Sequence, residues 1–144
     1  MQIRKMSFIL GLVLAAAMVS PVVDADEINQ ATNVTFSQPV QIPGKTLPAG
    51  SYLIQLAGSL SDREIVQVFN DKHELLTTLF AIPRQRQAAG EHTAFVLANK
   101  GEGSPEAVVA WFYPGSTEGH QLLYPKSERQ QLGRVKTETV VAGN

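Results

Sequence analysis

The sequence predicts a single all-β domain, an antiparallel β-sandwich with a small β-barrel as the alternative, behind an N-terminal signal peptide. Beyond the leader, short apolar-polar alternations recur between turn residues, and long helical periodicity is missing. Pro43-Gly44 and Pro114-Gly115 fit the central pair of a type II turn, because proline presets φ and glycine accepts the positive value. Seven or eight strands at this spacing are typical of a sandwich or a small barrel.

The leader itself predicts export. Arg4 and Lys5 give a cationic start, an apolar run from Met6 to Val19 follows, and Val23-Asp24-Ala25 offers small residues at the −3 and −1 positions of a cleavage site. The apolar run is shorter than the ~20 residues that a membrane-spanning helix needs. We therefore expect residues 1–25 to be a signal peptide cut after Ala25. The mature chain is then secreted or periplasmic, without membrane insertion.

The strands follow from local alternation. Val34 and Phe36 alternate with polar neighbours, and Tyr52, Ile54 and Leu56 share one side of a second strand. The other predicted strands are Val40 to Ile42 at an edge, Ile65 to Phe69, Leu75 to Ala81, Thr93 to Leu97, Val108 to Tyr113 and Gln121 to Tyr124. Asn70-Asp71-Lys72 tolerates turn conformations, so it predicts a hairpin between the fourth and fifth of these strands.

Residues 26–126 form the predicted sandwich domain, and residues 127–144 differ from it in sequence pattern. Ser127 to Gln131 is polar and could begin a short helix, with Leu132 and Val135 three residues apart on one side. Chain ends of low apolar content seldom order, so we expect residues 127–144 to be a mobile tail rather than a docked helix. A tether is a further interpretation of the same segment.

Composition excludes several functions. Without its leader the chain has ten basic and twelve acidic side chains, a formal charge of −2. This mixture lacks the clustered Lys and Arg that nucleic acids require, and it gives no polybasic membrane patch. The chain has no cysteine, so disulfides, thiolate metal sites, cysteine nucleophiles and an acylated lipoprotein cysteine are all excluded. The fold must therefore rest on its hydrophobic core, and the sequence points to no cofactor.

His73, His92 and His120 are the candidates for a metal site or a general base. Zinc sites usually contain close pairs of ligands, because one rigid element then positions two of them. Here the separations are 19 and 28 residues, which favours loop histidines over a three-histidine site. Gly-x-Ser-x-Gly, phosphate loops and dinucleotide fingerprints are missing as well, so no catalytic residue is predicted.

Trp111 and Tyr113 lie in the most apolar predicted strand. Strand alternation places Val109, Trp111 and Tyr113 on one face, and Val108, Ala110 and Phe112 on the other. The favoured interpretation is a central strand covered on both sides. The alternative is an exposed aromatic platform for a sugar ring or an extended peptide, because flat rings bury much area at small entropic cost.

Arg84 and Arg86 follow Ile82-Pro83, where the proline is expected to end the strand ladder. Their alternate spacing directs them to one side, where they could bind a carboxylate or phosphate of a partner. A solvated strand edge is the alternative interpretation.

Three sequence blocks resemble a group of small exported bacterial β-proteins. They are Thr35-Phe36-Ser37-Gln38-Pro39-Val40-Gln41-Ile42-Pro43-Gly44, Leu47-Pro48-Ala49-Gly50-Ser51-Tyr52 and Ala110-Trp111-Phe112-Tyr113-Pro114-Gly115. The resemblance covers residues 26–126. It implies secretion and a β fold, and it carries over no catalytic or binding residue.

These observations predict a non-catalytic binding or structural module of the bacterial cell envelope, with a protein or glycan partner. Two alternatives stay open. One is a small metal-dependent or acid-base hydrolase that uses loop histidines, and the other is a carrier of an apolar ligand.

Overall fold

A computed structural model describes residues 29–60 and 63–141, so the predicted signal peptide lies outside the described residues. The described chain forms ten strands and one short helix. The first five strands are β1 (Thr32–Phe36), β2 (Val40–Ile42), β3 (Lys45–Leu47), β4 (Gly50–Leu60) and β5 (Arg63–Asn70). The rest of the chain forms β6 (Leu75–Gln85), β7 (Ala94–Ala98), β8 (Glu106–Phe112), β9 (Glu118–Leu122), α1 (Lys126–Leu132) and β10 (Thr137–Val141). The predicted all-β class is confirmed.

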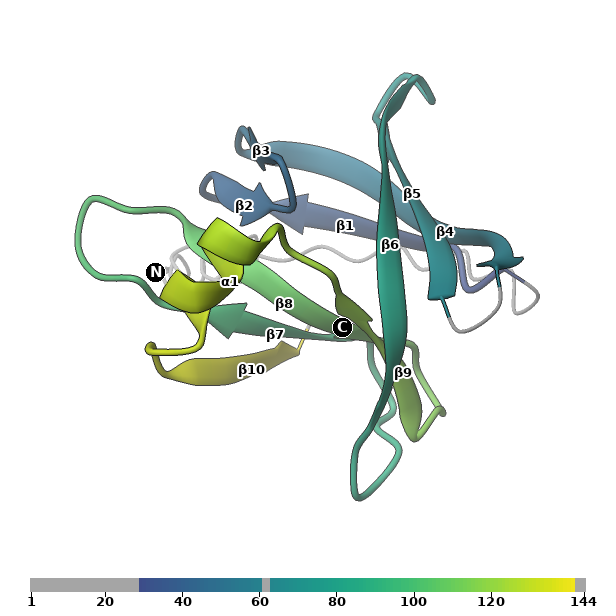
Figure 1. Cartoon of the computed structure of the whole chain (residues 1–144). Coiled ribbons are helices and arrows are strands. Elements are labelled where there is room, and N and C mark those ends of the chain that lie inside the picture. Colours follow the sequence, from purple (N-terminus) through teal and green to yellow (C-terminus); the bar gives the residue numbers. More distant parts are fainter. Residues whose placement is uncertain (1–28, 61–62, 142–144) are drawn as a thin grey trace, which may run out of the picture.

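The strands share one hydrogen-bonded path in the order β1-β4-β5-β6-β9-β8-β2-β3, and β7 joins β8 to β10. Figure 1 shows β6 as a long strand that connects the β4–β5 side of the molecule to the β8–β9 side. Among the described residues β1 pairs only with β4, and β10 pairs only with β7. The path is therefore open rather than closed into a barrel, and its two halves pack face to face like a sandwich.

The core lies between these two halves. Ile54, Val66, Val68 and Leu79 come from one half, and the other half contributes a second buried set, namely Phe95, Leu97, Val108, Trp111 and Leu122. Alternate residues of β5 are buried, as period-two alternation requires of a strand with one face in the core. The fold therefore rests on apolar packing between layers.

The predicted hairpin between β5 and β6 is confirmed. The Asn70 side chain accepts hydrogen bonds from the backbone N–H groups of Lys72 and Glu74, both at 2.9 Å. His73 completes the turn with a positive φ of 62°. An asparagine that hydrogen-bonds its own turn is the expected use of this residue type at a strand reversal.

The expectation that Pro83 ends the strand ladder is wrong. β6 pairs with β5 as far as Ala81 and then with β9 from Ala81 to Gln85, where Pro83 lies opposite His120. Beyond Ala81 the β5 side of β6 has no strand partner among the described residues. A proline without an N–H is tolerated there, because a strand edge requires no donor.

The predicted faces of β8 also need correction. Val96 pairs with Ala110 and Leu97 pairs with Val108, which leaves Val109 as an extra residue in β8. Such a bulge shifts the alternation by one position. Val108 therefore shares the main core with Trp111, whereas Ala110 and Phe112 form a second buried cluster with Ala94 and Val96.

Residues 127–141 differ from the predicted mobile tail, and residues 142–144 lie outside the described residues. α1 covers Lys126–Leu132, and β10 pairs antiparallel with β7 from Thr137 to Val141. Leu132 and Val135, the two apolar residues noted in the sequence, pack against the core. The physical reason is tertiary: β7 offers a free edge, and the Thr-Glu-Thr-Val-Val sequence of β10 suits a strand. No helix in the described part of the chain is both long and apolar enough to cross a membrane.

Tyr124, which lies between β9 and α1, is hydrogen-bonded to two other strands. Its hydroxyl donates toward the carbonyl oxygens of Val108 at 2.7 Å and Gln41 at 3.1 Å, which links β8 to β2. Burial raises the pKa of the Tyr124 phenol well above its ordinary value of 10, and the nearby Glu128 carboxylate raises it further. The folded state therefore keeps the Tyr124 proton at a pH at which the unfolded chain loses it.

This difference predicts alkaline destabilisation. Above pH 10 the unfolded chain binds fewer protons than the folded one, so the Tyr124 contribution to stability falls by about 1.4 kcal/mol per pH unit. Below pH 10 the contribution is fully present. Tyr124→Phe is expected to lower the free energy of unfolding by roughly 1 kcal/mol at pH 7, because the hydrogen bonds are lost. Above pH 10 the free energy of unfolding of this variant should fall less steeply with pH. Urea denaturation at pH 7 to 11 measures both, and equal alkaline slopes in the two proteins would contradict the assignment.

Candidate functional site

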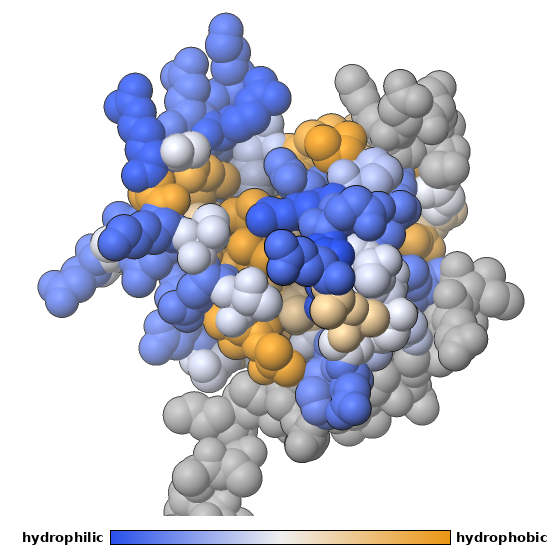
Figure 2. Space-filling view, turned by 90° about the horizontal axis from the view of Figure 1, so that it is seen from below, coloured by the Kyte–Doolittle hydropathy of each residue, from blue (hydrophilic) through white to orange (hydrophobic). Residues whose placement is uncertain are grey.

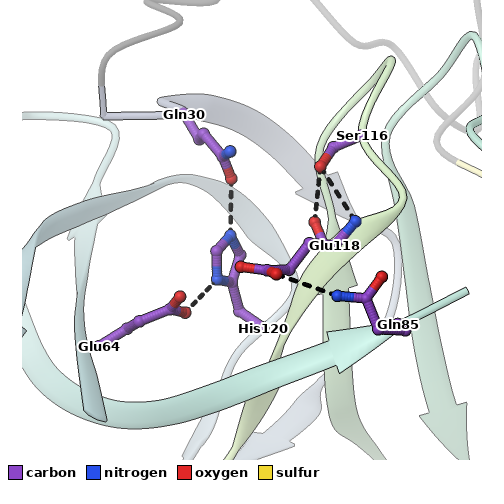
Figure 3. A network of polar contacts seen from close by, with 6 residues as sticks. All are labelled: Gln30, Glu64, Gln85, Ser116, Glu118 and His120. Atoms are coloured by element: carbon purple, nitrogen blue, oxygen red, sulfur yellow. Dashed lines mark hydrogen bonds and ion pairs between the residues drawn. The ribbon is translucent and has the colours of Figure 1, made fainter. Parts of the chain in front are cut away.

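A polar network surrounds the buried His120 of β9 (Figure 3). The ring Nδ1 contacts the Glu64 carboxylate of β5, and Nε2 lies 2.6 Å from the Gln30 side-chain oxygen. The Trp111 ring lies against the imidazole, with the ring centres 4.9 Å apart. His120 is 3 % exposed. The network ties together the segment before β1, the start of β5 and the middle of β9.

This network has a structural role. Each ring nitrogen of His120 has a side-chain partner, and burial of the imidazole keeps both nitrogens away from solvent. A charged or polar side chain in a core requires such partners, because an unpaired one would be costly to bury. His120 is therefore a core histidine with both ring nitrogens hydrogen-bonded, and its contacts hold together three segments that are distant in the sequence.

The other two candidate histidines are placed elsewhere. His73 is exposed in the β5–β6 turn, and His92 is exposed in the loop that precedes β7. Across residues 29–60 and 63–141, no three His, Asp or Glu side chains gather in a group that could hold a metal ion. The geometry therefore gives the hydrolase alternative no support from the histidines.

Trp111 and Tyr113 are both buried, at 1 % and 7 % exposure. Trp111 packs in the main core, and β8 is covered on its second face by the smaller cluster around Phe112. This arrangement agrees with the favoured interpretation of a covered central strand. Neither ring presents a face to solvent, so an aromatic platform for a sugar is not part of this surface.

The two arginines have different surroundings. The Arg86 guanidinium donates to the backbone carbonyls of Ser116 at 2.9 Å and Tyr113 at 3.3 Å, and it lies 4.7 Å from the centre of the Phe112 ring. Its charge and its stem are used to hold the β8–β9 turn and to cover Phe112. Arg84 is half-buried in β6, opposite Gly119, whereas Arg86 follows the end of that strand. The structure thus assigns Arg86 to the fold.

The candidate binding site is a groove that the sequence did not reveal. It has a volume of about 480 Å³ and lies between β1 on one side and β7 and β10 on the other. Phe95 and Leu97 of β7 form its apolar floor, and the Phe36 ring reaches across to Phe95 with the ring centres 5.8 Å apart. The groove is the seam that the open sheet leaves between its first strand and its β7–β10 branch.

The groove follows a strand edge on its β1 side, whereas β7, which pairs with both β8 and β10, contributes alternate residues of one face. Three consecutive residues of β1 line it, Val34 to Phe36, and their side chains point alternately to opposite faces. Only an edge brings such neighbours to the same cavity. Val140 and Val141 of β10 are likewise consecutive and line the opposite wall. Among the described residues β1 pairs only with β4 and β10 pairs only with β7, so each strand has one unpaired edge.

Exposed apolar side chains are otherwise scattered. In the part of the chain that the structure describes, the large ones are Leu75 and Phe80 on β6, and Val140 and Val141 on β10. Figure 2 shows the lower face of the molecule, where hydrophobic side chains lie in separate patches between polar ones. Scattered apolar residues are normal on a protein surface. The groove is therefore the feature in which apolar exposure coincides with a concave shape.

Two features of the site escaped sequence reasoning. The contact of Glu64 with His120 bridges 56 residues of sequence, and no local pattern reveals it. The groove is built by β1 and by β10, a strand that the sequence did not predict. No protein-family model matches the chain, and neither the curated proteins nor the solved structures contain a match to it.

Proposed function

We propose that this chain is an exported, non-catalytic binding module of the cell envelope, and that it holds an extended segment of a partner protein in the groove. The observation that carries the proposal is the path of the groove along the edge of β1 that has no strand partner within residues 29–60 and 63–141. Strand addition at such an edge supplies affinity through main-chain hydrogen bonds, and alternate side chains of the added strand enter the adjacent pocket. The leader signature supports export.

Other described features favour binding over catalysis. Both nitrogens of the one buried histidine are engaged, and the groove lining contains no histidine. A glycan partner has less support than a protein, because the rings of Trp111 and Tyr113 are buried. The apolar floor of Phe95 and Leu97 suits aliphatic or aromatic side chains of a peptide.

Site-specific photo-crosslinking tests the function. A photoreactive amino acid at Val141, which is 51 % exposed in the groove wall, is compared with the same group at Leu75, which is 50 % exposed on β6. In the host envelope we expect a discrete adduct from position 141 and none from position 75. Mass spectrometry should place the crosslink within an extended segment of the partner. Equal adduct yields from the two positions would overturn the proposal.

A carrier of an apolar ligand is the second candidate, and the groove volume favours it. A cavity of about 480 Å³ falls within the range of about 300–1,000 Å³ that is common for small-molecule sites. Saturable one-to-one binding of the neutral dye Nile red, together with no crosslinked protein from position 141, would favour this function over peptide binding.

A further inference from the structure

The groove has an apolar end and an acidic end. β10 pairs with β7 so that Val141 lies opposite Ala94, the first residue of β7, whereas Thr137 lies opposite Ala98, the last. Val140 and Val141 therefore mark the end at which β7 begins. Glu102 lies in the loop that follows Ala98, and Glu106 opens β8 next to Val40. Both glutamates line the groove.

The acidic end has no compensating charge among the described lining residues. Within that part of the chain the lining contains Glu102 and Glu106 and no Lys, Arg or His. The ammonium group of the neighbouring Lys100 contacts the Gln41 side chain. Neither glutamate forms an ion pair within the described part of the chain, although Glu106 is half-buried. A cation that comes close to a carboxylate in partly apolar surroundings is attracted to it more strongly than it would be in bulk water.

The loop that carries Glu102 is built by its own hydrogen bonds. The Asn99 side chain accepts a bond from the Gly101 N–H at 2.9 Å, and the Gly101 carbonyl accepts a bond from the Ser104 N–H at 3.3 Å. These bonds hold the turn beyond β7, so the position of Glu102 at the end of the groove does not depend on a ligand. The apolar floor and the acidic end are thus both features of the protein alone.

We infer that the groove selects a basic segment: a stretch of partner protein in extended conformation, with apolar side chains at alternate positions and Lys or Arg about four residues further along. The inference rests on the proposed function and adds the chemistry of the partner. Its spacing comes from the length of β7, because the four steps from Ala94 to Ala98 span roughly 14 Å at about 3.4 Å per residue. The apolar residues lie over Phe95 beside the edge of β1, and the cation lies between Glu102 and Glu106.

Two synthetic peptides test the inference. One is acetyl-Val-Thr-Val-Thr-Lys-Thr-Lys-amide, and the other has Glu in place of both Lys. Titration of the 15N-labelled protein at low salt should shift the amide signals of the groove residues, with the lysine peptide binding roughly fivefold more tightly, as expected for two ion pairs at a wet rim. The preference should shrink as salt is added, because exposed charges are screened.

Variants assign the preference to the two glutamates. The double variant Glu102→Gln/Glu106→Gln should bind the two peptides about equally, while Glu91→Gln keeps the full preference, because Glu91 is an exposed glutamate outside the groove. Equal binding of both peptides to the unmodified protein overturns the basic-segment inference and leaves the proposed function standing. If neither peptide shifts the groove signals, both fail. Shifts that depend on protein concentration alone would make a second copy of the chain the occupant and would also overturn the inference.

Discussion

Replacing Trp111 with alanine is expected to lower the free energy of unfolding by about 3–5 kcal/mol, as for other large-to-small changes in a packed core. The indole is 1 % exposed and lies at the centre of the main core, between the two halves of the sheet. It also covers the imidazole of His120. Its loss leaves a cavity and weakens the surroundings of the His120–Glu64 contact. A loss of this size is a large fraction of the total stability of an ordinary domain.

Trp111→Phe provides the matched variant. The indole N–H has no hydrogen-bond partner among the described residues, so phenylalanine removes volume without breaking a hydrogen bond, and we expect a smaller loss of roughly 1–2 kcal/mol. Circular dichroism with urea is the suitable measurement, because Trp111 is the one tryptophan of the chain and its fluorescence is lost in both variants. A Trp111→Ala protein of unchanged stability that no longer binds its partner would contradict the core role and support the alternative interpretation of an exposed aromatic platform.

The strands were predictable because each carries its pattern locally. Period-two alternation in β4 and β5, and a turn-forming asparagine between β5 and β6, need no knowledge of the partner strand. Pro43-Gly44 behaved in the same way, since Gly44 has the positive φ of 82° that a type II turn requires. The turn leads into β3, whose three residues were too short a run to be recognised from alternation.

Features that depend on distant partners were not predictable. β6 continues through Pro83 because it exchanges β5 for β9 at Ala81, which only the assembled sheet determines. The bulge at Val109 follows from the pairing of β8 with β7. β10 forms because β7 has a free edge to receive it, and its own residues are all exposed. Each of these features depends on a partner strand that lies outside the local stretch of sequence.

The same limit applies to the candidate site. His120 was singled out for its chemistry, but its partners Glu64 and Gln30 lie 56 and 90 residues away. The groove arises from edges that stay apart, and sequence alternation reports faces rather than edges. Arg86 showed the opposite case, because a residue type suited to binding anions was used to hold a turn and to cover Phe112.

Gly119→Ala is the second substitution with a large expected effect, although it adds one methyl group. A Cβ at this position in β9 would lie 2.4 Å from one ring carbon of Phe112 and 2.6 Å from the Trp111 carbonyl oxygen. Neither neighbour has room to move: Phe112 is buried beneath the Arg86 guanidinium, and the carbonyl belongs to the backbone of β8. We expect stability to fall by about 3 kcal/mol, at the upper end for overpacking, and the melting temperature to fall by roughly 10 °C.

Gly90→Ala is the control for this substitution. A Cβ there would lie 3.5 Å or more from its neighbours, an ordinary van der Waals distance, and the backbone of Gly90 avoids the left-handed region. Loss of glycine at an unstrained loop position restricts the unfolded chain, so Gly90→Ala should be neutral or slightly stabilising. Thermal unfolding of the two alanine variants side by side separates steric exclusion from a general effect of removing glycine. Equal melting temperatures for Gly119→Ala and Gly90→Ala would mean that β8 and β9 do not lie as close together as the structure places them. The packing of Trp111 and His120 between the layers would then be wrong as well.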